Sequence, residues 1–157
     1  QMDLQLVVLG AGEEKYERML LYFASRYPRQ VSVNLGFSEY LARNIYAASD
    51  MYLMPSKFEP CGISQLIALR YGSVPIVRET GGLRDTIIPY NEYSGEGNGF
   101  GFRNFNAHEL LFTIQKAVRF YHQPEVWAGI VKNCLSTDFS WKRSAREYSE
   151  LYKTLAW

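Results

Sequence analysis

The sequence predicts an α/β fold, a Rossmann-like parallel sheet with helices on both faces. Short apolar runs alternate with longer amphipathic segments, and Gly or Pro residues separate many of them. The 157 residues are 47% hydrophobic and 21% charged, which suits a soluble domain with one buried core. Alternating strands and helices are typical of a parallel, doubly wound sheet. We therefore expect one Rossmann-like domain over residues 1–157.

Each predicted element has a local signal. The segment from residue 13 to 27 is acidic at its start and basic near its end, Ser38 is a helix cap, and Gly72 follows a helix as a C-cap. The predicted strands are Leu4–Leu9, Val31–Leu35, Met51–Met54, Val74–Val77 and Phe100–Phe102. The predicted helices are Glu13–Tyr27, Glu39–Ala48, Ile63–Tyr71, Ala107–Tyr121, Pro124–Cys134 and Trp141–Leu155.

Composition excludes several classes of function. A net charge of +1 gives no electrostatic reason for binding nucleic acid or a membrane surface, and no apolar run approaches the roughly 20 residues of a membrane helix. Cys61 and Cys134 fit a reducing compartment, and neither has a partner at metal-ligand spacing. We expect no metal site.

Ligands of such a sheet bind outside the carboxyl ends of the strands. The first loop there, Gly10–Gly12, resembles a dinucleotide fingerprint only weakly, because Lys15 stands where a third glycine belongs. No acidic residue closes the second strand, which argues against a nicotinamide cofactor. Two interpretations stay open: a tight turn, or close approach of the backbone to a sugar or phosphate.

The loop after the third predicted strand carries the run Glu59-Pro60-Cys61-Gly62-Ile63-Ser64. A carboxylate followed by the N–H groups of a helix start is able to hold a sugar hydroxyl beside a phosphate. The alternative is that Glu59 only caps the helix near Ile63. We expect Cys61 to be a small buried residue and not a nucleophile, because no histidine stands near it in sequence.

Two adjacent glycines, Gly81 and Gly82, follow the fourth predicted strand. Their successive N–H groups would form an anion-binding nest, and the alternative is a simple turn. Both this loop and the Glu59 loop are expected at the same edge of the sheet.

Three motifs resemble those of glycogen and starch synthases, glycosyltransferase family 5. The run from Pro55 to Gln65 resembles the family's main signature, the run from Thr80 to Thr86 resembles its second, and Asp138–Trp141 resembles the turn before its last helix. The resemblance extends over essentially the whole chain, in order.

The resemblance implies the C-terminal, donor-binding half of a GT-B enzyme that transfers glucose from ADP-glucose to the non-reducing end of an α-1,4-glucan with retention. It implies no metal and no nicotinamide. Glu59 matches the key catalytic carboxylate, Phe37 the ring that stacks on adenine, and Ser64 a phosphate contact. Ile67 stands where sucrose-synthase-like relatives have a second glutamate. The implied substrate-binding residues are Gly36, Phe37, Ser56, Cys61, Gly62, Ile63, Ser64, Thr80, Gly81 and Gly82.

The abrupt start at Gln1 suggests that the chain is excised from a longer protein. The resemblance implies an N-terminal domain and an Arg/Lys diphosphate clamp before that residue, and a fragment that is inactive alone. The final helix, 141–155, would pack on that absent domain, so we expect its apolar side chains to be partly exposed here and to favour self-association. The bacterial resemblance implies a cytoplasmic protein. A stand-alone nucleotide-sugar-binding or regulatory module without catalysis is the alternative.

Overall fold

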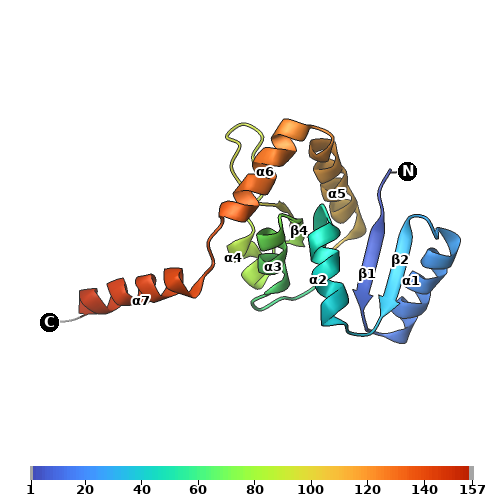
Figure 1. The fold of residues 1–157 in the computed structure, drawn as a ribbon, viewed down its shortest axis with the longest axis horizontal. Helices are drawn as coiled ribbons and strands as arrows, with labels where there is room; N and C mark the ends of the chain where they lie inside the picture. The colour runs from blue at the N-terminus through green and yellow to red at the C-terminus, as the bar shows by residue number, and fades with distance from the viewer. Residues whose placement is uncertain (1, 156–157) are drawn as a thin grey trace. The chain divides into compact units, whose positions relative to one another are not determined.

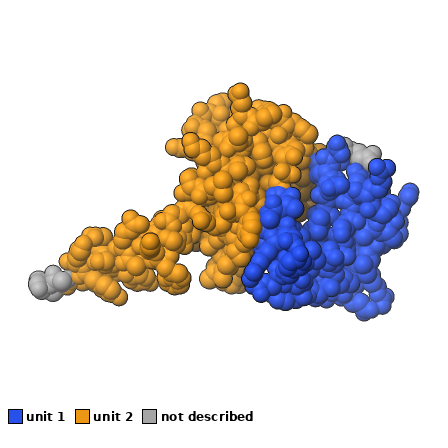
Figure 2. All heavy atoms as spheres, in the orientation of Figure 1, with its two compact units in different colours: residues 1–49 blue, residues 50–157 orange. Residues whose placement is uncertain are grey.

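Parallel strands in two sheets form the framework of residues 2–155, which are the residues that this computed structural model describes (Figure 1). The chain divides into unit 1, which ends at Ser49, and unit 2, which begins at Asp50 (Figure 2). Each unit has its own sheet and its own helices. No helix within residues 2–155 is both long and apolar enough to cross a membrane.

Unit 1 is a pair of parallel strands with two helices. Leu6 lies opposite Val31 and Gly10 lies opposite Leu35, while one helix packs on each strand. The second helix begins after Ser38, whose Oγ accepts a hydrogen bond of 3.2 Å from the N–H of Leu41, as its cap position predicts. The elements are β1 (Leu6–Gly10), α1 (Glu14–Arg26), β2 (Val31–Leu35) and α2 (Glu39–Ala48).

Unit 2 is a three-stranded parallel sheet of order β3-β4-β5 with five helices described. Met51 lies opposite Val74 and Ile76 opposite Phe100, so β4 is the central strand. The strands are β3 (Met51–Met54), β4 (Val74–Arg78) and β5 (Phe100–Phe102). The helices are α3 (Ser64–Tyr71), α4 (Gly81–Thr86), α5 (Ala107–Tyr121), α6 (Pro124–Ser136) and α7 (Trp141–Leu155).

The core of unit 2 surrounds β4. Every residue from Val74 to Val77 is buried, as expected for a central strand of a parallel sheet that helices cover. Tyr90, Phe100 and Phe120 form an aromatic cluster beside it, with ring centroids 5.2 to 6.4 Å apart. Each large side chain buried here contributes roughly 1.5–3 kcal/mol. The strand ends that carry the candidate loops are therefore firmly held. Other buried members of the core of unit 2 are Leu69, Leu83, Ile87, Ala117, Ile130 and Cys134.

The predicted α/β class with parallel strands is confirmed. The bounds of β2, α2, β3, β5, α5 and α7 agree with the prediction, and the other predicted elements differ by one or two residues at one or both ends. One element was missed, because α4 begins at Gly81 where a loop was expected. Adjacent glycines disfavour a helix, but here they form its first turn, and the buried Leu83 follows them. The expectation of one domain over residues 1–157 stays a prediction.

Candidate functional site

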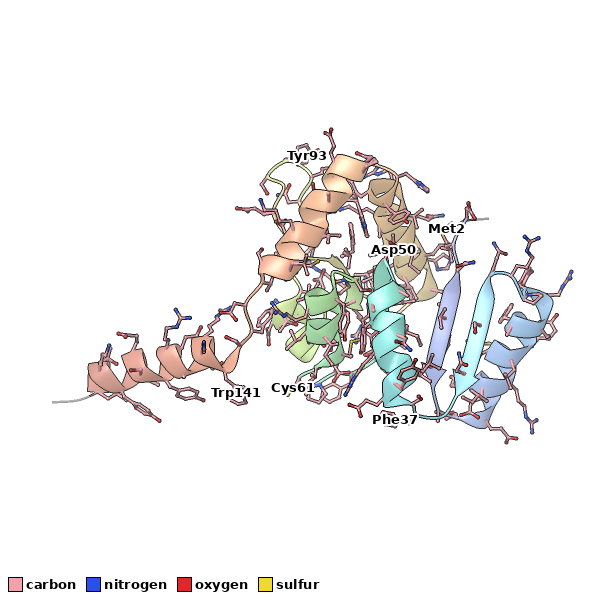
Figure 3. All side chains as sticks on the ribbon, in the orientation of Figure 1. Met2, Phe37, Asp50, Cys61, Tyr93 and Trp141 are labelled. Atoms are coloured by element: carbon pink, nitrogen blue, oxygen red, sulfur yellow. The ribbon has the colours of Figure 1, made fainter. Side chains whose placement is uncertain are left out.

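The loop between β3 and α3 carries Glu59 and Cys61, the second of which is labelled in Figure 3. Ile63 is the N-cap residue of α3, and no side chain among residues 2–155 caps this helix, so the alternative role of Glu59 as its cap is excluded. Glu59 is half-buried, and within residues 2–155 its carboxylate has no hydrogen-bond or ion-pair partner. The carboxylate is therefore free to contact a ligand.

The first turn of α3 offers N–H groups without a side-chain acceptor. Such N–H groups, together with the helix dipole, favour an anion. Ser64, the first residue of the helix, donates its hydroxyl to Sδ of Met54 at 3.3 Å. Its predicted phosphate contact would require rotation of this side chain. Ile63, also a predicted contact residue, is 70% exposed beside this turn.

The second candidate loop packs directly against the first. An added Cβ at Gly81 would lie 1.9 Å from the carbonyl oxygen of Glu59, and one at Gly82 would lie 1.8 Å from that of Cys61. The N–H of Gly82 donates to the carbonyl oxygen of Pro60 at 3.1 Å. Only glycine allows this approach.

The prediction of an anion nest at the two glycines is therefore wrong in one respect. The N–H of Gly82 already has an acceptor within the protein, so the two successive N–H groups are not both available to a ligand. The glycines instead allow the two signature segments to touch. Thr80 precedes them in extended conformation, half-buried, and its side chain does not cap α4.

Two residues that hold the site together were missed from the sequence. Arg78, at the end of β4, donates through Nη1 to the carbonyl oxygens of Ser56 (3.2 Å) and Lys57, and through Nε to that of Arg103 (3.2 Å). Gln65, fully buried in α3, donates to the carbonyl oxygen of Gly62 at 3.0 Å. The hydrogen-bond partners of Arg78 are distant in sequence, and the Gly62 partner of Gln65 lies across a turn. The only local signal is a polar residue within a buried segment.

Unit 1 carries the remaining predicted contact residues. Gly36 has a φ of 109°, and Phe37 is 93% exposed at the turn before α2 (Figure 3). A phenyl ring this exposed is available for stacking on a flat ligand group.

Gly10 is the last residue of β1, and Gly12 lies in the turn after it. Neither has a positive φ, and an added Cβ at either would meet nothing within 4 Å. Backbone conformation and packing within the described residues therefore do not require glycine there, so the tight-turn interpretation loses its basis. Close approach of the backbone to a ligand stays a prediction.

The two cysteines differ in environment. Cys61 is exposed, so the expectation that it is buried is wrong. It lies in the loop before α3, on the outside of the molecule (Figure 3). Cys134 is fully buried in α6, where it donates to the carbonyl oxygen of Asn98 at 3.2 Å. Burial raises the pKa of the Cys134 thiol to about 12, which keeps it protonated and unreactive.

Comparison with known proteins agrees with the motifs. A family model described as glycosyl transferases group 1 matches residues 1–128. The chain is 61% identical over 154 residues to a glycogen synthase from Desulforamulus reducens, covering 98% of this chain and 32% of that protein. It is 56% identical over 155 residues to a glycogen synthase from Clostridium novyi, covering 99% and 32%. The chain thus spans about a third of the length of these relatives.

A solved structure is also similar. The catalytic domain of starch synthase IV from Arabidopsis thaliana, bound to ADP and acarbose, matches with a TM-score of 0.83 and 36% identity, covering 96% of this chain and 32% of that one. The predicted resemblance to glycogen and starch synthases is confirmed, and so is the Rossmann-like fold class expected for a GT-B glycosyltransferase. The match over residues 1–128 shows that the chain belongs to the glycosyl transferases group 1 family.

Proposed function

We propose that this chain is the donor-binding half of a retaining glucosyltransferase that transfers glucose from ADP-glucose to the non-reducing end of an α-1,4-glucan. The observation that carries the proposal is the direct packing of the Gly81–Gly82 turn against the Glu59 loop. Two segments that were singled out separately in the sequence form one surface. Within the part of the chain that the structure describes, this surface has a carboxylate without a partner and a helix start without a side-chain cap. The similarity to glycogen synthases and to an ADP-bound starch synthase supports the same assignment.

The proposed chemistry follows from these groups. Breaking the bond between glucose and the diphosphate places negative charge on the leaving oxygen, and the first-turn N–H groups of α3 are suited to stabilise that charge. The Glu59 carboxylate would position the glucose and favour positive character at its anomeric carbon. The N–H groups of Cys61 and Gly62 would hold glucose hydroxyls, and Phe37 would stack on the adenine. We propose that no metal and no nicotinamide takes part.

The proposal extends to partners and location. We propose that an N-terminal domain of the same protein supplies the acceptor cleft, and that an Arg/Lys clamp for the diphosphate stands on a segment of this same domain before Gln1. We also propose that the protein is cytoplasmic. We also propose that α7 promotes self-association of the isolated chain, because its apolar side chains are exposed: Trp141 by 87%, Tyr148 by 59%, Leu151 by 50% and Tyr152 by 65%.

An activity assay tests the proposed function. In a full-length protein that contains this chain, Glu59→Ala should lower glucose transfer from ADP-glucose to glycogen by on the order of a hundredfold or more. Glu125→Ala, at an exposed position in the first turn of α6, is the control and should leave the rate unchanged. The isolated chain should show no turnover. An unchanged rate in Glu59→Ala, or turnover by the isolated chain, would contradict the proposal.

A further inference from the structure

Gln65 is an unusual residue for the interior of unit 2. It lies in the first turn of α3, its side chain is fully buried, and its amide reaches three acceptors. Nε2 donates to the carbonyl oxygen of Gly62 at 3.0 Å, to that of Cys61 at 3.4 Å, and to Oγ1 of Thr86 at 3.2 Å. One side chain therefore contacts both candidate loops.

The contact continues into α4. Oγ1 of Thr86 donates to the carbonyl oxygen of Gly82 at 2.6 Å, so a hydrogen-bonded path runs from Gly62 through Gln65 and Thr86 to Gly82. A second path runs through the hydrogen bond between Gly82 N–H and the Pro60 carbonyl. The two paths join the same two segments at different points.

The amide oxygen of Gln65 shows that space filling alone does not explain a polar side chain at this position. Oε1 of Gln65 is buried and has no hydrogen-bond partner among residues 2–155. Turning the amide around would place Oε1 against two carbonyl oxygens, which is worse, so the NH₂ group belongs where it is. A buried acceptor without a donor costs free energy, and a methionine of similar length would avoid that cost. The hydrogen bonds that Nε2 of Gln65 donates must therefore offset this cost.

The backbone of Gly62 packs against the side-chain amide of Gln65. A Cβ added to Gly62 would lie 2.5 Å from Oε1 of Gln65. The backbone of the loop is in contact with the side chain, so the place of the Gly62 carbonyl depends on the amide beneath it.

We propose that Gln65 is a positioning residue, whose buried amide sets the backbone of the Cys61–Gly62 turn relative to the start of α4. The identity of the ligand that binds this surface depends on the proposed function, whereas the positioning role of Gln65 does not. Gln65 does not touch the donor in this proposal; it fixes the groups that do.

The test uses the 157-residue chain and three variants. Gln65→Met keeps side-chain length and removes the donated bonds. Thr86→Val is nearly isosteric and removes the middle of the path. Thr113→Val is the matched control, because Thr113, like the half-buried Thr86, lies in a helix and donates to the carbonyl four residues earlier, that of Glu109, at 2.8 Å.

Two readouts separate positioning from general destabilisation. Hydrogen exchange of the Gly82 N–H, measured by NMR, should be about tenfold faster in Gln65→Met and Thr86→Val, relative to the N–H of Ile130 in the core. Thr113→Val should leave this ratio within about twofold of the wild-type chain. The affinity for ADP-glucose, whose glucose the Cys61–Gly62 turn is proposed to hold, should fall about tenfold in the first two variants and not in the control.

The outcomes are distinct. Gly82 exchange that rises no more than Ile130 exchange in both variants would overturn the inference. Faster relative exchange in a chain that binds no ADP-glucose would support the positioning role and count against the proposed function. If Gln65→Met does not fold, Thr86→Val alone decides, since it changes only one hydroxyl to a methyl group.

Discussion

The N–H of Gly82 donates a hydrogen bond to the carbonyl oxygen of Pro60, with 3.1 Å between nitrogen and oxygen. This bond joins the first turn of α4 to the loop that carries Glu59. The glycines of the second signature, Thr80–Thr86, thus have a structural role. They carry no side chains, which allows the first signature, Pro55–Gln65, to pack directly against their backbone.

Substitution of Gly82 tests that relationship. Gly82→Ala should destabilise the chain by about 3 kcal/mol, because its Cβ would lie 1.8 Å from the Cys61 carbonyl oxygen and the backbone must shift. Gly129→Ala is the control, since Gly129 lies within α6 and its added Cβ would meet nothing within 4 Å. It should stabilise by about 0.5–1 kcal/mol. Urea unfolding measures both, and equal effects would contradict the packing argument.

The start of α5 predicts a pH dependence of stability. Hydrogen bonds from the side chain and then the backbone N–H of Asn104 hold the pKa of Glu109 below its ordinary value of 4.5. A lowered pKa in the folded state means that the carboxylate stabilises the fold above about pH 4.5 and that this contribution is lost as pH falls through the lowered value.

Glu109→Gln should therefore be less stable than the wild-type chain at pH 7 and should approach it at acid pH. Thermal unfolding between pH 7 and pH 3 checks this. Glu125→Gln, at the start of α6, serves as the comparison. A stability difference for Glu109→Gln that stays constant with pH would show that the charge of Glu109 is not involved.

The two thiols should react at very different rates. Cys61 is exposed, whereas Cys134 is fully buried with its pKa raised to about 12. A thiol reagent at neutral pH should modify one cysteine quickly and the second only after unfolding by denaturant. Cys61→Ser should abolish the fast reaction. Fast modification of both thiols in the folded chain would contradict the described burial.

The apolar side chains of α7 predict concentration-dependent association. Tyr148 and Leu151 are 59% and 50% exposed, and every described residue of the helix except Ser144 is exposed. Sedimentation should show larger species as the wild-type chain is concentrated, and the double substitution Tyr148→Ser with Leu151→Ser should reduce them. Glu147→Ser is the control. Association that the double substitution leaves unchanged would mean that another surface is responsible.

Much of the framework was predictable because its signals are local. Ser38 marks the start of α2 through a hydrogen bond three residues away, and Gly72 ends α3 with a φ of 73°. The run from Val74 to Val77 is apolar throughout and is the central strand. Each of these features depends on neighbours in the chain, which sequence patterns describe well.

The contacts that hold the candidate site together could not be predicted in the same way. Gly81 and Gly82 indicate a turn when read alone, and the helix they begin is stabilised by contacts with Glu59, Pro60 and Cys61. Arg78 and Gln65 contact carbonyl oxygens, which every residue carries, so no sequence pattern marks their acceptors. The exposure of Cys61 likewise follows from the path of the loop.

The most direct test of the proposed function is nucleotide binding by the 157-residue chain. Calorimetric titration should show weak binding of ADP, with a Kd of roughly 1 mM, and weaker binding of UDP. Phe37→Ala and Glu59→Ala separate contacts with the base from contacts with the sugar: the first should abolish ADP binding and the second should leave it nearly unchanged. Tyr93→Ala, which removes an aromatic ring that is 94% exposed elsewhere, should have no effect. Preference for UDP, or ADP binding that survives in Phe37→Ala, would contradict the account.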